Sequence, residues 1–153
     1  MSFTEKDYNN LTESIINCCI DVHKELGPGL MESVYEICLM SVFKKNNIFA
    51  QKQVLLPVVF KGETLDKEFI IDILVDDKIV LELKSVENIL PVHEAQLVTY
   101  LKLSDKKLGL LINFNVALLK NGIKRKINVN LNSVCSVNSV FKNLYNEKRI
   151  FCA

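Results

Sequence analysis

Two carboxylates and a lysine near the middle of the chain are the residues whose types and spacing best suit catalysis. Two short apolar runs, 69–75 and 79–84, are separated by a polar loop, a pattern that predicts a β-hairpin. Asp72 lies in the first run, and Glu82 and Lys84 lie in the second. The pattern is therefore an aspartate, nine intervening residues, and then Glu-x-Lys.

The alternation of apolar residues selects the register of this hairpin. With a loop at 76–78, Asp72 lies directly opposite Glu82, with Cβ atoms about 4.5–5.5 Å apart. A loop one residue shorter or longer would mix apolar and polar side chains on each face. In the favoured register one face is entirely apolar and consists of Phe69, Ile71, Ile73, Val75, Ile79, Leu81 and Leu83. The charged face is flanked by Ile70, Leu74 and Val80, which we expect to exclude part of the water.

Carboxylates that face each other across a ladder repel, so they need a compensating charge. A hard divalent cation supplies it, because Mg²⁺ and Mn²⁺ prefer oxygen ligands and bind through one or two carboxylates with carbonyls and waters. Lys84 on the same face could orient or activate a metal-bound water, which indicates metal-assisted hydrolysis. The hairpin alone fits a second interpretation equally well, in which Glu82 and Lys84 form a solvated ion pair and Asp72 is an isolated charge.

A predicted helix upstream carries further acids. Glu32, Tyr35 and Glu36 fall at positions i, i+3 and i+4, so they share one helix face. One of the two acids could supply another metal ligand. The alternative is an ordinary polar helix face, and for Glu36 we favour that alternative.

A polar stripe on a later helix consists of His93, Gln96 and Tyr100, among Val, Ala and Leu residues. A single histidine at a helix start is more often a cap or a surface residue than a ligand. Gln96 and Tyr100 are better placed to form hydrogen bonds with a phosphate or a lysine.

The elements that position these residues follow from periodicity. A helix begins after a Thr4–Asp7 capping box and ends at Gly27-Pro28-Gly29. The other expected elements are a helix at 30–45, an edge strand with Pro57, a turn at 61–63, the hairpin, a helix at 91–103, a strand at 108–114 and a last strand through Ile127. No assignment is made for the Asn- and Ser-rich stretch 128–139. The order indicates an α/β or α+β domain.

Composition limits the function classes. The chain has 153 residues, 49% of them hydrophobic, and a net charge of +1. Its length and hydrophobic content predict a single folded domain (1–153, core about 8–129, C-terminal extension 130–153). The balanced charge provides no global attraction to nucleic acid or to an anionic membrane. No apolar run approaches the roughly 18 residues of a membrane span, and the amino terminus is polar. Five cysteines without metal-site spacing indicate reduced thiols, and we expect a cytoplasmic protein with no membrane partner.

Several ordered blocks resemble one family. Residues 29–35 (GLMESVY) resemble the GxxExxY signature, and residues 91–101 (PVHEAQLVTYL) and 110–115 (LLINFN) resemble its other blocks. The chain is similar to GxxExxY proteins of the PD-(D/E)XK nuclease superfamily, from about Ile15 to Val129. The resemblance implies a restriction-endonuclease-like αβββαβ core, with a mixed central sheet flanked by helices.

The resemblance also implies roles for individual residues. Asp72 matches the first acid of the superfamily, Glu82 and Lys84 match its ExK, Glu32 matches the acid of the first core helix, and Gln96 with Tyr100 match its QxxxY. The usual proline before the first acid is replaced by Ile71. Asp72 and Glu82 would hold the ion with the Leu83 carbonyl and with Glu32.

The favoured hypothesis is a nuclease dependent on Mg²⁺ or Mn²⁺ that hydrolyses phosphodiester bonds, with DNA a better candidate substrate than RNA. The alternative is a non-catalytic module of the same fold, for binding or as an accessory to a nucleic-acid defence or repair system, acting as a homodimer or with a partner protein. The near-neutral charge slightly favours the alternative. The dense basic cluster, Lys124-Arg125-Lys126, fits a solvated strand edge better than a nucleic-acid footprint.

Overall fold

The computed structural model describes residues 3–129 of the chain. The predicted extension 130–153, with Cys135, Cys152 and most of the Asn- and Ser-rich stretch, lies outside the described residues. The elements are α1 (Glu5–Leu26), α2 (Glu32–Lys45), β1 (Ala50–Phe60), β2 (Glu63–Val75), β3 (Ile79–Lys84), α3 (Pro91–Leu103), β4 (Leu108–Asn113), a short 3-10 helix η1 (Leu119–Gly122) and β5 (Ile123–Ile127). This order confirms the predicted αβββαβ core and the additional last strand.

The five strands form one mixed sheet in the order β1-β2-β3-β4-β5. β3 and β4 pair in parallel, and the other neighbouring strands pair antiparallel. Parallel neighbours need a crossover connection, which α3 provides between β3 and β4. The fold is therefore α+β and is consistent with the restriction-endonuclease-like architecture.

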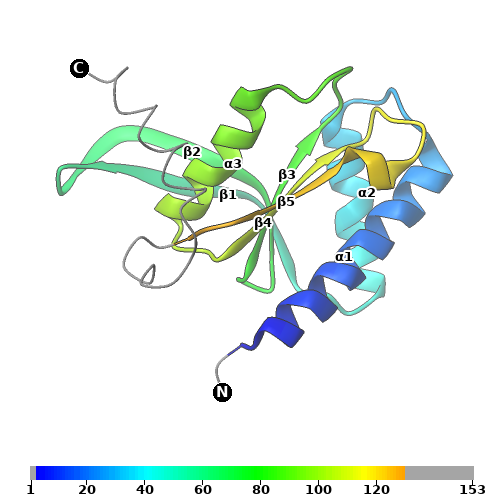
Figure 1. The fold of residues 1–153 in the computed structure, drawn as a ribbon, viewed down its shortest axis with the longest axis horizontal. Helices are drawn as coiled ribbons and strands as arrows, with labels where there is room; N and C mark the ends of the chain where they lie inside the picture. Colours follow the sequence, from blue (N-terminus) through cyan, green and yellow to red (C-terminus); the bar gives the residue numbers. More distant parts are fainter. Residues whose placement is uncertain (1–2, 130–153) are drawn as a thin grey trace, which may run out of the picture.

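Different helices cover the two faces of the sheet. α1 and α2 pack on one face, over a core that includes Ile73 and Leu81. α3 packs on the other face with Leu97 and Leu101, against Val80 and other residues of the central strands. Figure 1 shows α1 and α2 on one side of the central strands and α3 on the other.

Helix α3 approaches β4 closely at Gly109. A Cβ atom added at this residue would lie 2.7 Å from Leu97 Cδ1 and 3.2 Å from Leu101 Cδ2. Both leucines are fully buried in the core under α3. The spacing between α3 and the sheet therefore depends on the missing side chain at this one position.

The connection between α1 and α2 follows from local sequence. The Thr4 hydroxyl accepts a hydrogen bond from the Asp7 N–H, and the Asp7 carboxylate accepts one from the Thr4 N–H, which confirms the predicted capping box. At the other end of α1, Gly27 and Gly29 have φ angles of 71° and 93°, which glycine adopts at little cost. These glycines end α1 and reverse the chain before α2.

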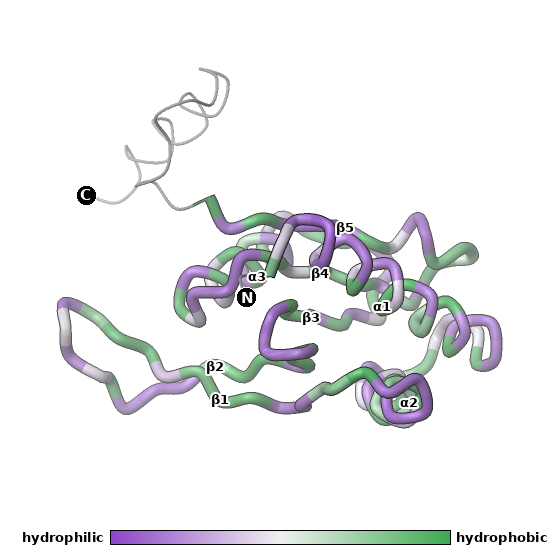
Figure 2. The backbone as a smooth tube through the Cα atoms, turned by 90° about the horizontal axis from the view of Figure 1, so that it is seen from below, coloured by the Kyte–Doolittle hydropathy of each residue, from purple (hydrophilic) through white to green (hydrophobic). Residues whose placement is uncertain are grey.

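Strands β1 and β2 form a long two-stranded ribbon that extends beyond the rest of the sheet (Figures 1 and 2). β1 is an edge strand, as Pro57 predicted. The ribbon turns at Lys61 and Gly62, where the sequence predicted a turn and where both φ angles are positive. Only the last three residues of β2 pair with β3, so most of β2 is bonded to β1 alone.

The predicted hairpin register is confirmed at its loop end. Ile73 pairs with Leu81, Leu74 with Val80, and Val75 with Ile79. Two parts of the prediction were wrong beyond these pairs: Phe69 and Ile71 belong to the core under α3 and not with Ile73 under α1 and α2. In addition Ile70, expected to help exclude water from the charged face, is 44% exposed.

Candidate active site

The ladder between β2 and β3 ends immediately before Asp72. Its last pair is Ile73 with Leu81. Beyond this pair, Asp72 Oδ2 accepts a hydrogen bond of 2.7 Å from the backbone N–H of Leu83. A side-chain carboxylate thus replaces strand pairing at the open end of the hairpin, and it ties Asp72 to the backbone between Glu82 and Lys84.

Glu82 is a buried acid with incomplete hydrogen bonding. Its side chain is 3% exposed, and its Oε1 accepts a hydrogen bond of 2.7 Å from Lys84 Nζ. Among residues 3–129, its other oxygen, Oε2, is buried without a hydrogen-bond partner. Burial, and next the negative charge of Asp72, raise the pKa of Glu82 to about 7. The effect of Asp72 on this pKa means that the two carboxylates lie close enough to repel.

Asp72 and Lys84 are also perturbed by this environment. Burial raises the pKa of Asp72 above its ordinary value, and the hydrogen bond from Leu83 opposes that rise only in part. For Lys84 burial lowers the pKa, but the hydrogen bond and charge of Glu82 outweigh it, and the net pKa is raised. Lys84 is therefore charged at neutral pH, as expected for an ammonium beside two carboxylates.

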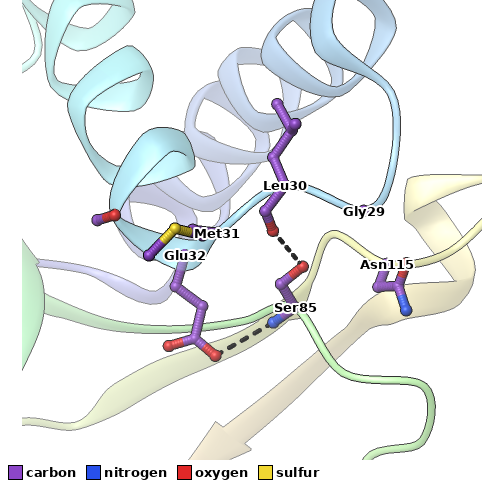
Figure 3. A pocket seen from close by; sticks show the side chains of 7 residues that line it. Gly29, Leu30, Met31, Glu32, Ser85 and Asn115 are labelled. Atoms are coloured by element: carbon purple, nitrogen blue, oxygen red, sulfur yellow. Dashed lines mark hydrogen bonds between the residues drawn. The ribbon is translucent and has the colours of Figure 1, made fainter.

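Asp72, Glu82 and Lys84 form one charged cluster. Glu32, the first residue of α2, lies exposed at the rim of this cluster. Its Oε1 accepts a hydrogen bond of 3.2 Å from the Ser85 N–H, and the Ser85 hydroxyl donates to the Leu30 carbonyl at 2.6 Å (Figure 3). Both bonds join the start of α2 to the residue after β3. The Glu32 charge contributes to the raised pKa values of Asp72 and Glu82, which places it near both acids.

An open pocket of about 610 Å³ adjoins Glu32. It is lined by Gly29, Leu30, Met31, Glu32, Ser33, Ser85 and Asn115, so the start of α2 and the residues that follow β3 and β4 surround it (Figure 3). Most of its lining is uncharged, and Glu32 provides the one carboxylate of that lining.

Tyr35 holds the turn that presents Glu32. Its ring is fully buried and stacks on Phe114, with 4.2 Å between ring centroids. Its hydroxyl donates to the Gly27 carbonyl at 2.7 Å and accepts from the Leu30 N–H at 3.1 Å. Tyr35 therefore fixes the glycine turn, and through it the first residue of α2.

Glu36 does not lie on an ordinary solvated helix face, so that interpretation was wrong. It is 8% exposed, and it accepts a hydrogen bond from the Gln53 side-chain amide. Lys52 Nζ lies 3.9 Å from its Oε1. The Glu36 charge also contributes to the raised pKa of Asp72.

On the other side of the sheet, α3 contributes Tyr100 and Gln96. Gln96 Nε2 donates a hydrogen bond of 2.7 Å to the Tyr100 hydroxyl, which leaves the phenolic proton free to be donated elsewhere. Burial raises the pKa of Tyr100, and the charges of Glu82 and Asp72 raise it further. Tyr100 is therefore close to the carboxylates. His93 is a cap, as expected, because its Nδ1 accepts from the Leu90 N–H.

The sequence of residues 9–126 matches the family described as the PD-(D/E)XK nuclease superfamily. The match covers most of the chain and includes every residue of the cluster. The chain belongs to this superfamily.

Other comparisons add little to this assignment. The crystal structure of SSO0001 is similar to 80% of this chain and to 59% of that protein, with 24% sequence identity and a TM-score of 0.45. This superfamily member therefore spans less than two thirds of that protein's length. No curated protein matches the sequence. None of the helices within residues 3–129 is long and apolar enough to cross a membrane.

The sequence pattern did not identify two polar residues near the site, Ser85 and Asn113. Ser85 joins β3 to α2, as described above. Asn113, at the end of β4, is 2% exposed; its Oδ1 accepts from the Val86 N–H at 3.1 Å, and its Nδ2 donates to the Val86 carbonyl at 2.8 Å. A polar residue at the end of a fully buried strand is the signal that could have identified Asn113. These bonds fix the chain that follows Lys84.

The basic residues of β5 are paired with other residues of this protein. Lys124 and Lys126 both form ion pairs with Glu94 of α3, and Arg125 donates to the Asn9 side chain at 3.0 Å. The three residues lie in β5, at the edge of the sheet opposite β1. They link β5 to α3 and α1.

Asp72 and Glu82 are suited to bind a divalent cation that takes only a few of its ligands from the protein. In the part of the chain that the structure describes, no three His, Cys, Asp or Glu side chains form a group able to hold an ion by themselves. Mg²⁺ does not need such a group, because it is commonly held by one or two carboxylates together with waters and substrate phosphates. The partnerless buried Oε2 of Glu82, beside the repelling carboxylate of Asp72, has the chemistry of a cation ligand.

Proposed function

We propose that the chain is a Mg²⁺- or Mn²⁺-dependent nuclease of the GxxExxY group, which hydrolyses phosphodiester bonds of nucleic acid. The observation that carries the proposal is the pair formed by half-buried Asp72 and buried Glu82. Their mutual repulsion and the partnerless oxygen of Glu82 are costly in a protein without a bound cation. Carboxylates with raised pKa values beside a lysine are typical of a functional site. DNA is the favoured substrate.

Asp72, Glu82 and the Leu83 carbonyl would hold the ion, and Glu32 would contribute from the rim directly or through water. A bound divalent ion lowers the pKa of a coordinated water and offsets charge that develops on the phosphate. The other roles belong to side chains of this chain. The Leu83 N–H keeps the Asp72 carboxylate in place before any ligand arrives.

Lys84 is the proposed positioning group for the attacking water. Its ammonium is held against Glu82 Oε1 and carries a proton at neutral pH, so it can bind a water oxygen or a phosphate oxygen but cannot act as a base. Tyr100 can donate its phenolic proton to a phosphate oxygen while Gln96 holds the hydroxyl from the other side. The chemistry is therefore orientation and charge stabilisation.

Titration of the purified protein with Mn²⁺ in a calorimeter tests the site without a substrate. Wild type is expected to bind Mn²⁺, and Asp72→Asn should weaken binding at least about tenfold, because one ligand charge is lost. Asp66→Asn is the matched control, because Asp66 is an exposed acid on the same strand. Equal isotherms for wild type and Asp72→Asn would contradict the site.

Cleavage assays then test the activity. Wild type with Mg²⁺ or Mn²⁺ is expected to cut at least one member of a panel of single- and double-stranded DNA and RNA. Lys84→Ala should abolish that cleavage while Mn²⁺ binding persists, because Lys84 is assigned to chemistry rather than to coordination. Lys106→Ala, which removes the surface lysine paired with Asp77, is the control.

A second candidate function is a non-catalytic binding or accessory module, alone as a homodimer or with a partner protein. The observation that favours it is the pairing of Lys124 and Lys126 with Glu94, because residues that bind nucleic acid usually keep their charges free for phosphates. A wild-type protein that binds Mn²⁺ but cuts nothing in the panel would favour this second function.

A further inference from the structure

Two consecutive residues of β1 contact the same carboxylate. The Gln53 amide donates to Glu36, and Lys52 Nζ lies 3.9 Å from it. Neighbouring side chains of a regular strand point to opposite faces of the sheet, so both should not reach one group. Gln53 has a φ angle of 52°, which lies in the left-handed region that a non-glycine residue adopts at a cost of about 1–3 kcal/mol. This backbone conformation accounts for the shared contact.

At the level of Gln53, the side chains of both β1 and β2 switch from the core under α1 and α2 to the core under α3. On β1, Ala50 packs with the core under α1 and α2, whereas Val54 packs with the core under α3, although the two are an even number of residues apart. On β2, Ile73 and Ile71 differ in the same way. The alternation therefore switches on both strands at one level of the ribbon.

Gln53 and Asp72 are the two residues at that level. The paired residues on either side are Lys52 with Ile73 and Val54 with Ile71, so Gln53 stands opposite Asp72. Asp72 is also where pairing with β3 stops and where its side chain binds the Leu83 N–H. The irregular backbone of one strand thus coincides with the unusual direction of the acid on its neighbour.

We propose that Gln53 is a positioning residue for the candidate metal site. Its hydrogen bond to Glu36 holds the left-handed backbone of β1, and this backbone turns Asp72 out of the regular pleat toward Leu83 and Glu82. The same bond keeps Glu36 buried beside Asp72 as an additional negative charge. The inference rests on the proposed function only in its consequence for the ion, because the effect on Asp72 exists in the metal-free protein.

Hydrogen exchange of the Leu83 amide in metal-free protein tests the effect on Asp72. Gln53→Ala removes the side-chain amide that holds the left-handed backbone, and alanine prefers ordinary strand backbone. Asp72 should then no longer accept the hydrogen bond from the Leu83 N–H, which should exchange about tenfold faster. Gln51→Ala, two residues away on the same strand and also exposed, should leave Leu83 exchange unchanged. If Gln53→Ala does not fold, Glu36→Ala removes the acceptor of the same hydrogen bond, and the same faster exchange of Leu83 is expected. Unchanged Leu83 exchange overturns the inference.

Calorimetry with Mn²⁺ alone tests the consequence for the ion. Gln53→Ala should raise the dissociation constant about tenfold, the usual size of an effect transmitted through a ligand's supporting residue. Glu36→Ala should have a similar effect, and the double variant should be no weaker than the weaker single variant, because both act through one contact. Additive losses would show that Gln53 does not act through Glu36. A wild type that binds Mn²⁺ as Gln53→Ala does overturns this inference alone, whereas a wild type that binds no Mn²⁺ overturns the proposed function.

Discussion

Two lysine–carboxylate pairs lie at opposite ends of the hairpin formed by β2 and β3. At the loop end, Lys106 Nζ contacts Asp77 at 2.8 Å, and the Asp77 side chain is 65% exposed. At the open end, Lys84 Nζ contacts Glu82 at 2.7 Å, and the Glu82 side chain is 3% exposed. The two distances are nearly equal, but the surroundings give the pairs opposite consequences.

Solvent accounts for this contrast. The hydrogen bond from Lys106 lowers the pKa of Asp77, so the exposed pair behaves as an ordinary surface ion pair of small value. Burial raises the pKa of Glu82 to about 7 even though Lys84 contacts it. The buried Glu82 carboxylate therefore lowers the stability of the protein without a ligand, even with Lys84 beside it.

The largest expected effect is a gain of stability in Glu82→Gln. A carboxyl whose pKa is raised from 4.5 to about 7 binds more protons in the folded state, so its penalty is absent below pH 4.5, grows as the pH rises and is complete above pH 7. The difference corresponds to about 3 kcal/mol at pH 8. Urea unfolding in the presence of a chelator should show the variant more stable than wild type at pH 8 and equal to it near pH 4.5. A gain that does not depend on pH would contradict this account of Glu82.

The next effect is a loss of stability in Lys84→Met. Without the ammonium, Glu82 takes up a proton, and protonation limits the cost at pH 8 to about 1–2 kcal/mol. The same urea measurement should show this loss shrinking as the pH falls through 7, because Glu82 is then protonated in both proteins. A loss that is larger at pH 5 than at pH 8 would mean that Lys84 stabilises the fold by packing.

A smaller effect is expected for Tyr100→Phe. The variant loses the hydrogen bond from Gln96, which costs about 1 kcal/mol, and it keeps the buried ring. Chemical unfolding of the metal-free protein measures this loss. Cleavage should fall by much more than the stability does if the phenol contacts the substrate, and Thr99→Ala, an exposed change on the same helix, provides the control.

The smallest effect is expected for Lys106→Met, the counterpart of Lys84→Met at the exposed end. The loss should be below about 1 kcal/mol and should diminish in salt, because solvent screens the pair. Unfolding at low and high ionic strength checks both points. If Lys106→Met cost as much as Lys84→Met, burial would not be the difference between the two ends of the hairpin.

The sequence was sufficient where the local pattern alone decides the structure. The pattern of apolar side chains on the two faces of the hairpin predicted the register that Ile73, Leu74 and Val75 have in the structure. Pro91 and the Thr4–Asp7 pair correctly marked the starts of two helices. The family resemblance contributed the superfamily and the fold, which the match over residues 9–126 supports. The roles of Asp72, Glu82, Leu83, Lys84 and Glu32 in metal binding and catalysis remain predictions.

The sequence was insufficient where contacts distant along the chain override the pattern. A glutamine in an exposed strand carries no signal for a left-handed backbone, so the switch of faces at Gln53 and the resulting position of Ile71 could not be predicted. Glu36 shares a helix face with Glu32, but its burial depends on β1, which supplies the hydrogen bond from Gln53 and the nearby charge of Lys52. Periodicity describes one element at a time, and these features arise between elements.

Gly109 influences where the Tyr100 hydroxyl lies relative to Asp72 and Glu82, because Tyr100 belongs to a helix and the two carboxylates belong to the sheet. Tyr100 is carried by α3, and α3 rests on β4 through Leu97 and Leu101 above that glycine. A methyl group at Gly109 would push against Leu97 and Leu101 of the helix that carries Tyr100, whereas Asp72, Glu82 and Lys84 belong to other strands. The position of Tyr100 is thus adjustable through a residue of β4 that lies beneath α3, separately from the residues that hold Asp72, Glu82 and Lys84 in place.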